Sequence, residues 1–132
     1  MVRKKKKIGK VIKAGDANVW PHEDATAVAL TLAGFTVEFI RKSERERENS
    51  ADCYIDGEKW EMKAPRSGRL TCVEDNLKRA AKQSERIIFD SRRMKRVPDN
   101  AIMRELSTQL QKSKTIKYIR FVNRHGETVD IE

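Results

Sequence analysis

The stretch that decides the fold runs from residue 51 to residue 63 and reads Ala-Asp-Cys-Tyr-Ile-Asp-Gly-Glu-Lys-Trp-Glu-Met-Lys. Asp56-Gly57 lies between two runs of alternating apolar and polar residues, which is typical of a two-residue β-hairpin turn. With the turn there, Cys53 faces Trp60 and burial of one side fixes the register. The predicted apolar side carries Ala51, Cys53, Ile55, Trp60 and Met62, and the polar side carries Asp52, Tyr54, Lys59, Glu61 and Lys63.

The same register predicts that two carboxylates lie opposite each other. Directly opposed residues have Cβ atoms about 4.5–5.5 Å apart, so Asp52 and Glu61 repel unless a cation lies between them. Mg²⁺ is commonly held by one or two carboxylates with phosphate and water, and Lys63 follows Glu61 on the same side. This set suits metal-assisted phosphodiester hydrolysis. It equally suits an exposed charged face, on which Lys59 and Lys63 pair with the acids.

Helices and strands are predicted on both sides of the hairpin, which indicates an α/β fold class with a mixed central sheet and flanking helices. One helix begins near Pro21 and ends at Gly34, and Glu23 in its first turn is either a third acid at the site or a stabiliser of the helix N-terminus. Its predicted inner face carries Ala25, Val28, Ala29 and Leu32. The other predicted elements are a strand over 35–40, an exposed charged loop over 41–50, a helix that follows a capping box of Thr71 and Glu74 and has Ser84 on its inner face, a strand over 87–89, a helix after Pro98, and two strands joined at His125-Gly126.

Composition narrows the class of partner. The 132 residues include 29 Lys and Arg against 20 Asp and Glu, a net charge of +9. Nucleic acid is the commonest partner of such a basic chain, although a protein can also be basic without binding a polyanion. We predict a basic N-terminal segment over 1–18, its first part a mobile tail, and a single domain over 19–132. Cys53 and Cys72 lack metal-ligand spacing and are expected to be buried apolar residues in a reducing compartment.

Neither a membrane protein nor a protein secreted through a signal peptide is expected. The longest uncharged stretch, residues 25–37, is too short and too rich in Thr and Gly to span a bilayer. The basic start is not followed by the apolar region of a secretory signal peptide.

The motif formed by Asp52, a short turn, and Glu61-x-Lys63 resembles the PD-(D/E)XK nuclease superfamily, in which an acidic residue on the preceding helix corresponds to Glu23. A narrower set resembles the CdiA C-terminal tRNase domain, a toxin domain of contact-dependent growth inhibition systems. The matching segments are Trp-Glu-Met-Lys-Ala-Pro at 60–65, Asn-Leu-Lys-Arg-Ala-Ala-Lys-Gln-Ser at 76–84, and Ile-Ile-Phe-Asp at 87–90 with Arg92 and Arg93. The resemblance covers about residues 20–132, and the basic N-terminus is not part of the family pattern.

The resemblance implies a PD-(D/E)XK nuclease-like fold and a metal-dependent endoribonuclease toxin that hydrolyses tRNA in the cytoplasm of a target cell. It implies that Glu23, Asp52 and Glu61 bind a divalent metal, Mg²⁺ or else Mn²⁺ or Zn²⁺, and that Lys63 is catalytic with them. A cognate acidic immunity protein is the second implied partner. A DNA endonuclease and a non-catalytic nucleic-acid-binding module are the alternatives, and the intact set of four residues counts against the second.

Further side chains are expected to contact phosphate, which positions a nucleic acid without reading its sequence. Ser84 is alternatively a small packing residue, and Arg92 and Arg93 are alternatively solvated. The predicted nucleic-acid-binding residues are Arg66, Arg69, Lys78, Lys82, Gln83, Ser84, Arg92 and Arg93.

Overall fold

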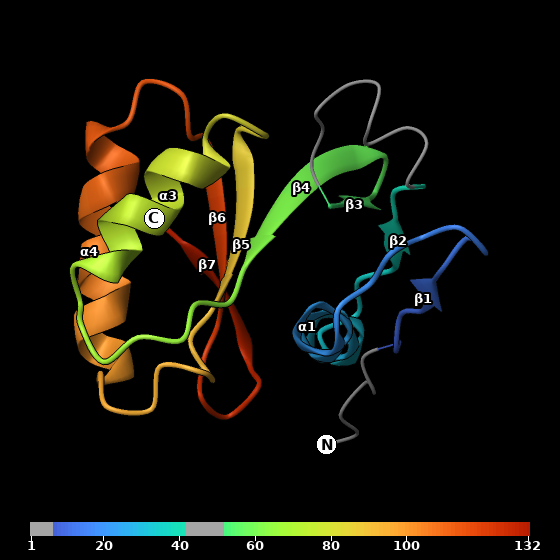
Figure 1. The fold of residues 1–132 in the computed structure, drawn as a ribbon, viewed down its shortest axis with the longest axis horizontal. Helices are drawn as coiled ribbons and strands as arrows, with labels where there is room; N and C mark the ends of the chain where they lie inside the picture. The colour runs from blue at the N-terminus through green and yellow to red at the C-terminus, as the bar shows by residue number, and fades with distance from the viewer. Residues whose placement is uncertain (1–6, 42–51) are drawn as a thin grey trace, which may run out of the picture.

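The computed structural model describes residues 7–41 and 52–132. Within them the chain is a mixed α/β structure in which seven strands form one curled sheet, ordered β1 to β7 as in the sequence (Figure 1). The elements are β1 (Val11–Ile12), α1 (Pro21–Leu32), β2 (Val37–Phe39), β3 (Cys53–Ile55), β4 (Glu58–Lys63), α3 (Cys72–Ala80), β5 (Arg86–Asp90), α4 (Asp99–Lys112), β6 (Tyr118–Val122) and β7 (Thr128–Ile131).

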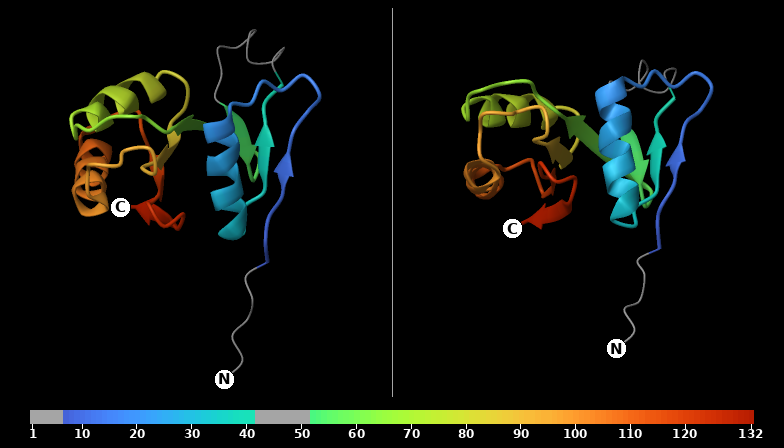
Figure 2. Two further views of the ribbon diagram at one scale, coloured as in Figure 1. Left: turned by 60° about the horizontal axis from the view of Figure 1, so that its bottom comes forward. Right: turned by 90° about the horizontal axis from the view of Figure 1, so that it is seen from below.

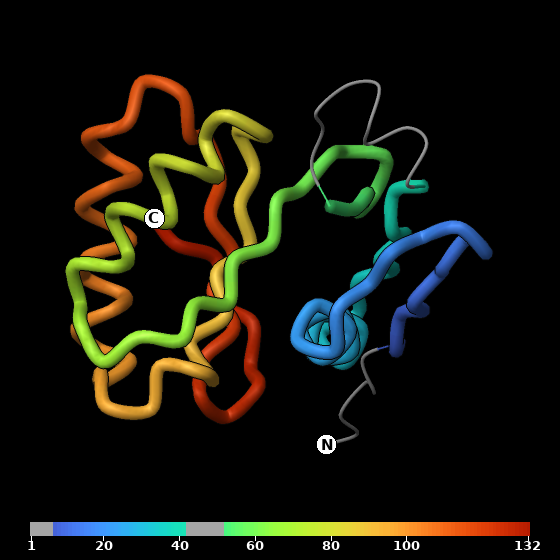
Figure 3. The backbone as a smooth tube through the Cα atoms, in the orientation of Figure 1, coloured from blue at the N-terminus to red at the C-terminus, as the bar shows by residue number. Residues whose placement is uncertain are grey.

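Strand β4 joins the two halves of the sheet. Its first half is antiparallel to β3, with Cys53 opposite Trp60, so the hairpin register is confirmed. Asp56 and Gly57 adopt the positive φ angles, 52° and 79°, that a tight hairpin turn requires. The second half of β4 is parallel to β5, with Lys63 beside Phe89. Figures 1 and 3 show β4 passing from one half of the sheet to the other.

Different helices cover the two faces of the sheet (Figure 2). Helix α1 packs through Leu30 on the face that carries Trp60 and Ile88. Helices α3 and α4 cover the opposite face of β5 to β7, where Phe89 and Leu106 belong to a second core. Adjacent residues Ile88 and Phe89 thus enter different cores, as the alternation of side chains along a strand dictates. Because β5 is buried on both faces, packing holds its end in place, and the residues that follow it start from a fixed position.

Helix α1 begins at Pro21 as expected, but its predicted inner face is wrong. Val28 and Leu32 are 47% and 61% exposed, whereas Thr26, Ala27 and Leu30 are almost completely buried. Of the four residues predicted to face inward, Ala25, Val28, Ala29 and Leu32, the structure buries only Ala29. The helix turns its polar residues Glu23 and Thr26 toward the sheet, and a search for apolar periodicity cannot detect a buried face that contains polar groups.

The sheet also contains a strand that the sequence does not predict. β1 is parallel to β2 in a part of the chain expected to belong to a basic tail. Gly9 N donates to Thr31 O at 2.9 Å and Val37 N donates to Lys10 O at 2.8 Å. Described residues at the start of the chain therefore pack against α1 and β2 rather than leaving the domain.

Four smaller points concern the remaining predictions. The helix after Thr71 forms, but the Thr71 side chain makes no capping hydrogen bond and α3 ends at Ala80, before Ser84. The predicted loop over 41–50 lies outside the described residues except for Arg41, as does Ala51. Both cysteines are free, with Cys53 buried and Cys72 half-buried. Among the described helices, none has the length and apolar character that crossing a membrane requires.

We expect Gly9→Ala to lower the free energy of unfolding by about 1–3 kcal/mol, the usual range for overpacking. A Cβ atom at position 9 would overlap the Phe35 carbonyl group, which is backbone and cannot move independently of the sheet. Gly15→Ala is the matched control, because a Cβ there meets nothing within 4 Å. Chemical unfolding measures both variants, and equal stabilities would show that the first strand contributes nothing to the domain.

Candidate functional site

The three predicted acids are buried, although carboxylates rarely lie inside proteins without partners. Glu23 on α1 is 8% exposed, Asp52 just before β3 is 5% exposed, and Glu61 on β4 is 7% exposed. These acids therefore do not lie on an exposed face, although Lys63 pairs with Glu61 as the alternative without catalysis also expected. Burying carboxylates is costly unless hydrogen bonds and cations compensate them, so their partners define the site.

Asp52 lies where β4 leaves β3. Its main-chain N–H donates at 3.2 Å to the carbonyl oxygen of Trp60, the residue that faces Cys53. Two residues further along β4, the Met62 N–H donates to Asp52 Oδ2 at 2.8 Å. The carboxylate thus accepts from an amide at the level where β4 passes from β3 to β5. This bond holds Asp52 against the strand that carries Glu61.

Glu61 and Lys63 share one side of β4 because they are two residues apart. Lys63 Nζ lies 3.7 Å from Glu61 Oε2, and both side chains are largely shielded, at 24% and 10% exposure. Glu23 Oε1 accepts a hydrogen bond of 2.9 Å from Trp20 N, the main-chain amide just before α1. Glu23 therefore stabilises the helix start, which is one of its two predicted roles, from a buried position.

The donor atoms of these side chains show which metal ion the site could hold. Within residues 7–41 and 52–132, no three His, Cys, Asp or Glu side chains are grouped so as to hold an ion by themselves. Asp52 and Glu61 offer hard oxygen donors on adjoining segments of the hairpin. That set fits Mg²⁺, which usually takes one or two carboxylates and completes its shell with water and substrate phosphate.

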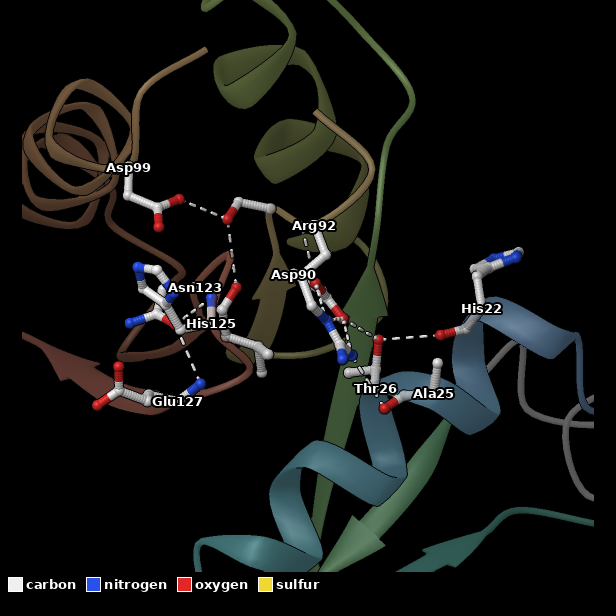
Figure 4. A network of polar contacts seen from close by, with 11 residues as sticks. His22, Ala25, Thr26, Asp90, Arg92, Asp99, Asn123, His125 and Glu127 are labelled. Carbon is white, nitrogen blue, oxygen red and sulfur yellow. Dashed lines mark hydrogen bonds and ion pairs between the residues drawn. The ribbon is translucent and has the colours of Figure 1, made fainter. Parts of the chain in front are cut away.

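Asp90 is a site residue that the sequence analysis missed. It ends β5, is 3% exposed, and lies one residue beyond the Phe89 that pairs with Lys63. Arg92 Nη2 lies 2.7 Å from Asp90 Oδ2, and Thr26 Oγ1 donates to the same oxygen at 2.6 Å. Arg92 Nη2 also donates to Ala25 O at 2.9 Å, so the pair ties β5 to the first half of α1 (Figure 4). In the sequence, Asp90 belongs to the segment 87–90 that resembles the CdiA C-terminal domain, but no motif spacing assigns it a role.

The loop after β5 is held in place from its other end. Ser91 N donates to Val122 O at 3.0 Å, and Ser91 Oγ donates to Asp99 Oδ1 at 2.7 Å. Arg124 N donates to the other oxygen of Asp99 at 2.9 Å. Met94 and Val97 from the same loop are buried. These contacts hold the main chain of the loop after β5 in place, so the positions from which its basic side chains extend are fixed.

Arg66 and Arg93 come together near the first turn of α1. Burial lowers the pKa of His22 from its ordinary value, and the positive charges of Arg93 and Arg66 lower it further. The negative charges of Asp52 and Asp90 act in the opposite direction and raise that pKa. In Figure 4 the imidazole of His22 points away from the Asp90 network. Asp52, Asp90, Arg66 and Arg93 therefore all lie within electrostatic range of His22 in the first turn of α1.

The other predicted nucleic-acid-binding residues do not all join this region. Arg69 is exposed on the loop after β4. Lys78 pairs with Glu74 at 3.0 Å on α3, which covers the face of the sheet opposite to α1, and Lys82 lies on the turn after α3. Ser84 Oγ donates to Lys59 O at 2.7 Å, which places it and the adjacent Gln83 beside the start of β4 and away from Lys63 at its end.

Comparison with known proteins gives the family. Residues 49–128, more than half of the chain, match the contact-dependent growth inhibition CdiA C-terminal domain. The chain belongs to this family. The match includes the hairpin with Asp52, Glu61 and Lys63, and it extends through Asp90 and Arg92.

A solved structure has the same fold as this member of the CdiA C-terminal domain family. It is a CdiA-CT/CdiI toxin and immunity complex from Burkholderia pseudomallei, and the TM-score is 0.68. The similarity covers 94% of this chain and 99% of that chain at 15% sequence identity, so it concerns the fold alone. No curated protein matches the sequence.

We expect Arg92→Ala to lower the free energy of unfolding by roughly 2–4 kcal/mol, because the buried Asp90 carboxylate would lose its counter-charge. The adjacent Arg93→Ala is the matched control, and we expect it to change stability by no more than about 0.5 kcal/mol. Urea unfolding of both variants measures the difference. Equal effects would show that the Asp90–Arg92 pair does not anchor α1.

We also expect an NMR titration to give His22 a pKa below its ordinary value, and Arg93→Ala to raise that pKa by removing a nearby positive charge. Because the folded-state pKa is the lower one, His22 reduces stability as the pH falls through the unfolded-state pKa toward the folded-state pKa. Arg104→Ala on the exposed side of α4 removes the same charge elsewhere and serves as the control. An unchanged His22 pKa in Arg93→Ala would contradict the described arrangement.

Proposed function

We propose that this chain is a metal-dependent endoribonuclease toxin domain that cleaves tRNA by hydrolysing a phosphodiester bond. The observation that carries the proposal is the burial of Asp52 and Glu61 beside Lys63 on one hairpin, in a member of the CdiA C-terminal domain family. Two buried carboxylates and a lysine on one hairpin are the side-chain types that metal-assisted phosphodiester hydrolysis uses. The net charge of +9 supports a polyanionic substrate.

We assign the roles of a PD-(D/E)XK-type site to the buried residues. Asp52 and Glu61 would hold the metal ion, and Glu23 would be the third acid at the site, although the three acids do not form a single three-ligand group within the described residues. A bound Mg²⁺, with Mn²⁺ and Zn²⁺ as alternatives, would polarise the phosphodiester and lower the pKa of an attacking water. Lys63 orients that water or stabilises the charge that develops on the phosphate.

Asp90 and Arg92 act as positioning residues in this proposal. Their ion pair and the Thr26 hydroxyl fix the first half of α1 against the end of β5. Glu23 lies one turn before Thr26 on the same buried face of that helix. The clamp therefore sets how far Glu23 reaches toward the acids of the hairpin, and a small displacement of a catalytic group can strongly reduce rate.

We further propose that the toxin acts in the cytoplasm of a target cell and that the producing cell holds a cognate immunity protein. The similar structure from Burkholderia pseudomallei is a toxin and immunity complex. Family membership extends that expectation to this chain. An acidic surface on the partner would complement the basic loops after β4 and β5.

We expect Lys63→Ala to reduce cleavage of total tRNA by at least about 100-fold, the lower range of a general acid–base contribution. Lys59→Ala is the matched control, because Lys59 precedes Glu61 by as many residues as Lys63 follows it. Tests with Mg²⁺ and with EDTA, on tRNA and on plasmid DNA, measure the substrate and the metal dependence.

Each outcome has a distinct meaning. Metal-dependent tRNA fragments that disappear in Lys63→Ala support the proposal. Cleavage of plasmid DNA alone would replace the substrate with DNA, and cleavage in EDTA would remove the metal from the mechanism. Binding without any cleavage by the wild-type chain would leave a nucleic-acid-binding module.

A further inference from the structure

A basic cleft of about 690 Å³ lies between the loop that follows β4 and the loop that follows β5. Its lining holds five cationic side chains together with Ser67 and Gly68, and none of the described lining residues is Asp or Glu. Because β4 and β5 are parallel neighbours, the loops after them start at the same end of the sheet, where Lys63 and Asp90 lie. The cleft therefore lies at the same end of the sheet as Lys63.

Four of the five cations are available to a ligand. Arg92 is engaged by Asp90, at 2.7 Å. Arg66, Arg93, Lys95 and Arg96 make no ion pair or side-chain hydrogen bond within the part of the chain that the structure describes. Like charges gathered in one concave region repel each other. A bound polyanion would relieve this repulsion. The stability of the fold does not itself require such a cluster of positive charges.

The position and rigidity of the cleft suit a phosphate backbone. Arg92, which lines the cleft, donates to Ala25 O at 2.9 Å, so the cleft adjoins the first half of α1. The buried Met94 and the bond from Ser91 to Asp99 hold the second loop in place, so binding costs little ordering of the main chain.

We propose that the basic cleft binds consecutive phosphates of the RNA backbone next to the bond that is cleaved. This inference rests on the proposed function and adds to it the place where the substrate strand is held. Four flexible cations around an open cleft match the charge of a phosphodiester chain rather than the edges of particular bases. The contacts therefore position the RNA without reading its sequence.

The first test measures tRNA binding in EDTA as a function of salt. Each phosphate contact contributes about 0.7 to the slope of log K against log salt for a single strand. We expect Arg93→Ala/Arg96→Ala to reduce that slope by about 1.4, and to weaken binding to unrelated RNA sequences by a similar factor. The control Arg79→Ala/Arg104→Ala removes the same charge from exposed positions of α3 and α4. A thermal unfolding measurement on the wild type and on both double variants checks that each of them is folded.

The second test places a negative charge inside the cleft and controls for the volume that the new side chain adds. A Cβ at Gly68 would lie 3.7 Å from Arg96 Cδ, an ordinary contact, so a side chain fits there. Gly68→Glu supplies a carboxylate that competes with phosphate, and Gly68→Gln has nearly the same shape without the charge. We expect tRNA affinity to fall at least tenfold further in Gly68→Glu than in Gly68→Gln.

The outcomes separate this inference from the proposed function. If the wild-type chain cleaves tRNA while the cleft variants keep its affinity and salt slope, the cleft proposal is wrong and the nuclease proposal stands. If the wild type binds but does not cleave, and the cleft variants lose the slope, the nuclease proposal is wrong and only the binding of the RNA backbone in the cleft is supported. An effect confined to binding of the cognate immunity protein would assign the cleft to that partner and overturn the inference.

Discussion

A hydrogen bond from the Met62 amide to the Asp52 carboxylate organises the candidate site. Strand β4 belongs to two pairings, antiparallel with β3 and then parallel with β5, and it must leave one neighbour to reach the other. At that level the main-chain N–H of Met62 donates to Asp52 at 2.8 Å. Buried amides require an acceptor, so a carboxylate is held at the divergence of the strands. Glu61 and Lys63 flank Met62 and lie within the same short segment.

The second constraint is the pairing of Asp90 with Arg92, which gives adjacent arginines different roles. Arg92 neutralises a buried carboxylate and reaches the main chain of α1. Arg93 contributes to a cleft whose cations stay available to a ligand. One arginine thus holds Asp90 and α1 in position, while the next lines the cleft proposed for the substrate. Their different neighbours, not their chemistry, produce this division.

The predictions from sequence succeeded where local rules act alone. The Asp56-Gly57 turn and the two-residue alternation were sufficient for the hairpin register, because one turn and one buried side determine it. The inner face of α1 was misjudged because Glu23 and Thr26 turn inward, and apolar periodicity assigns polar residues to the surface. β1 was missed because Val11 and Ile12 are flanked by lysines, and only pairing with β2 makes that segment a strand.

The sequence by itself determined the α/β class, the hairpin that carries Asp52, Glu61 and Lys63, and the excess of positive charge. These depend on neighbours along the chain, whose spacing is set by covalent geometry and secondary structure. Only the tertiary structure decided that the acids are buried, that Asp90 clamps α1 through Arg92, and that basic residues from two loops line one cleft. Those features join residues far apart in the chain, such as Thr26 and Asp90 at a separation of 64 positions, or loops on neighbouring parallel strands. Such contacts arise from packing the helices on the sheet, which no local pattern records.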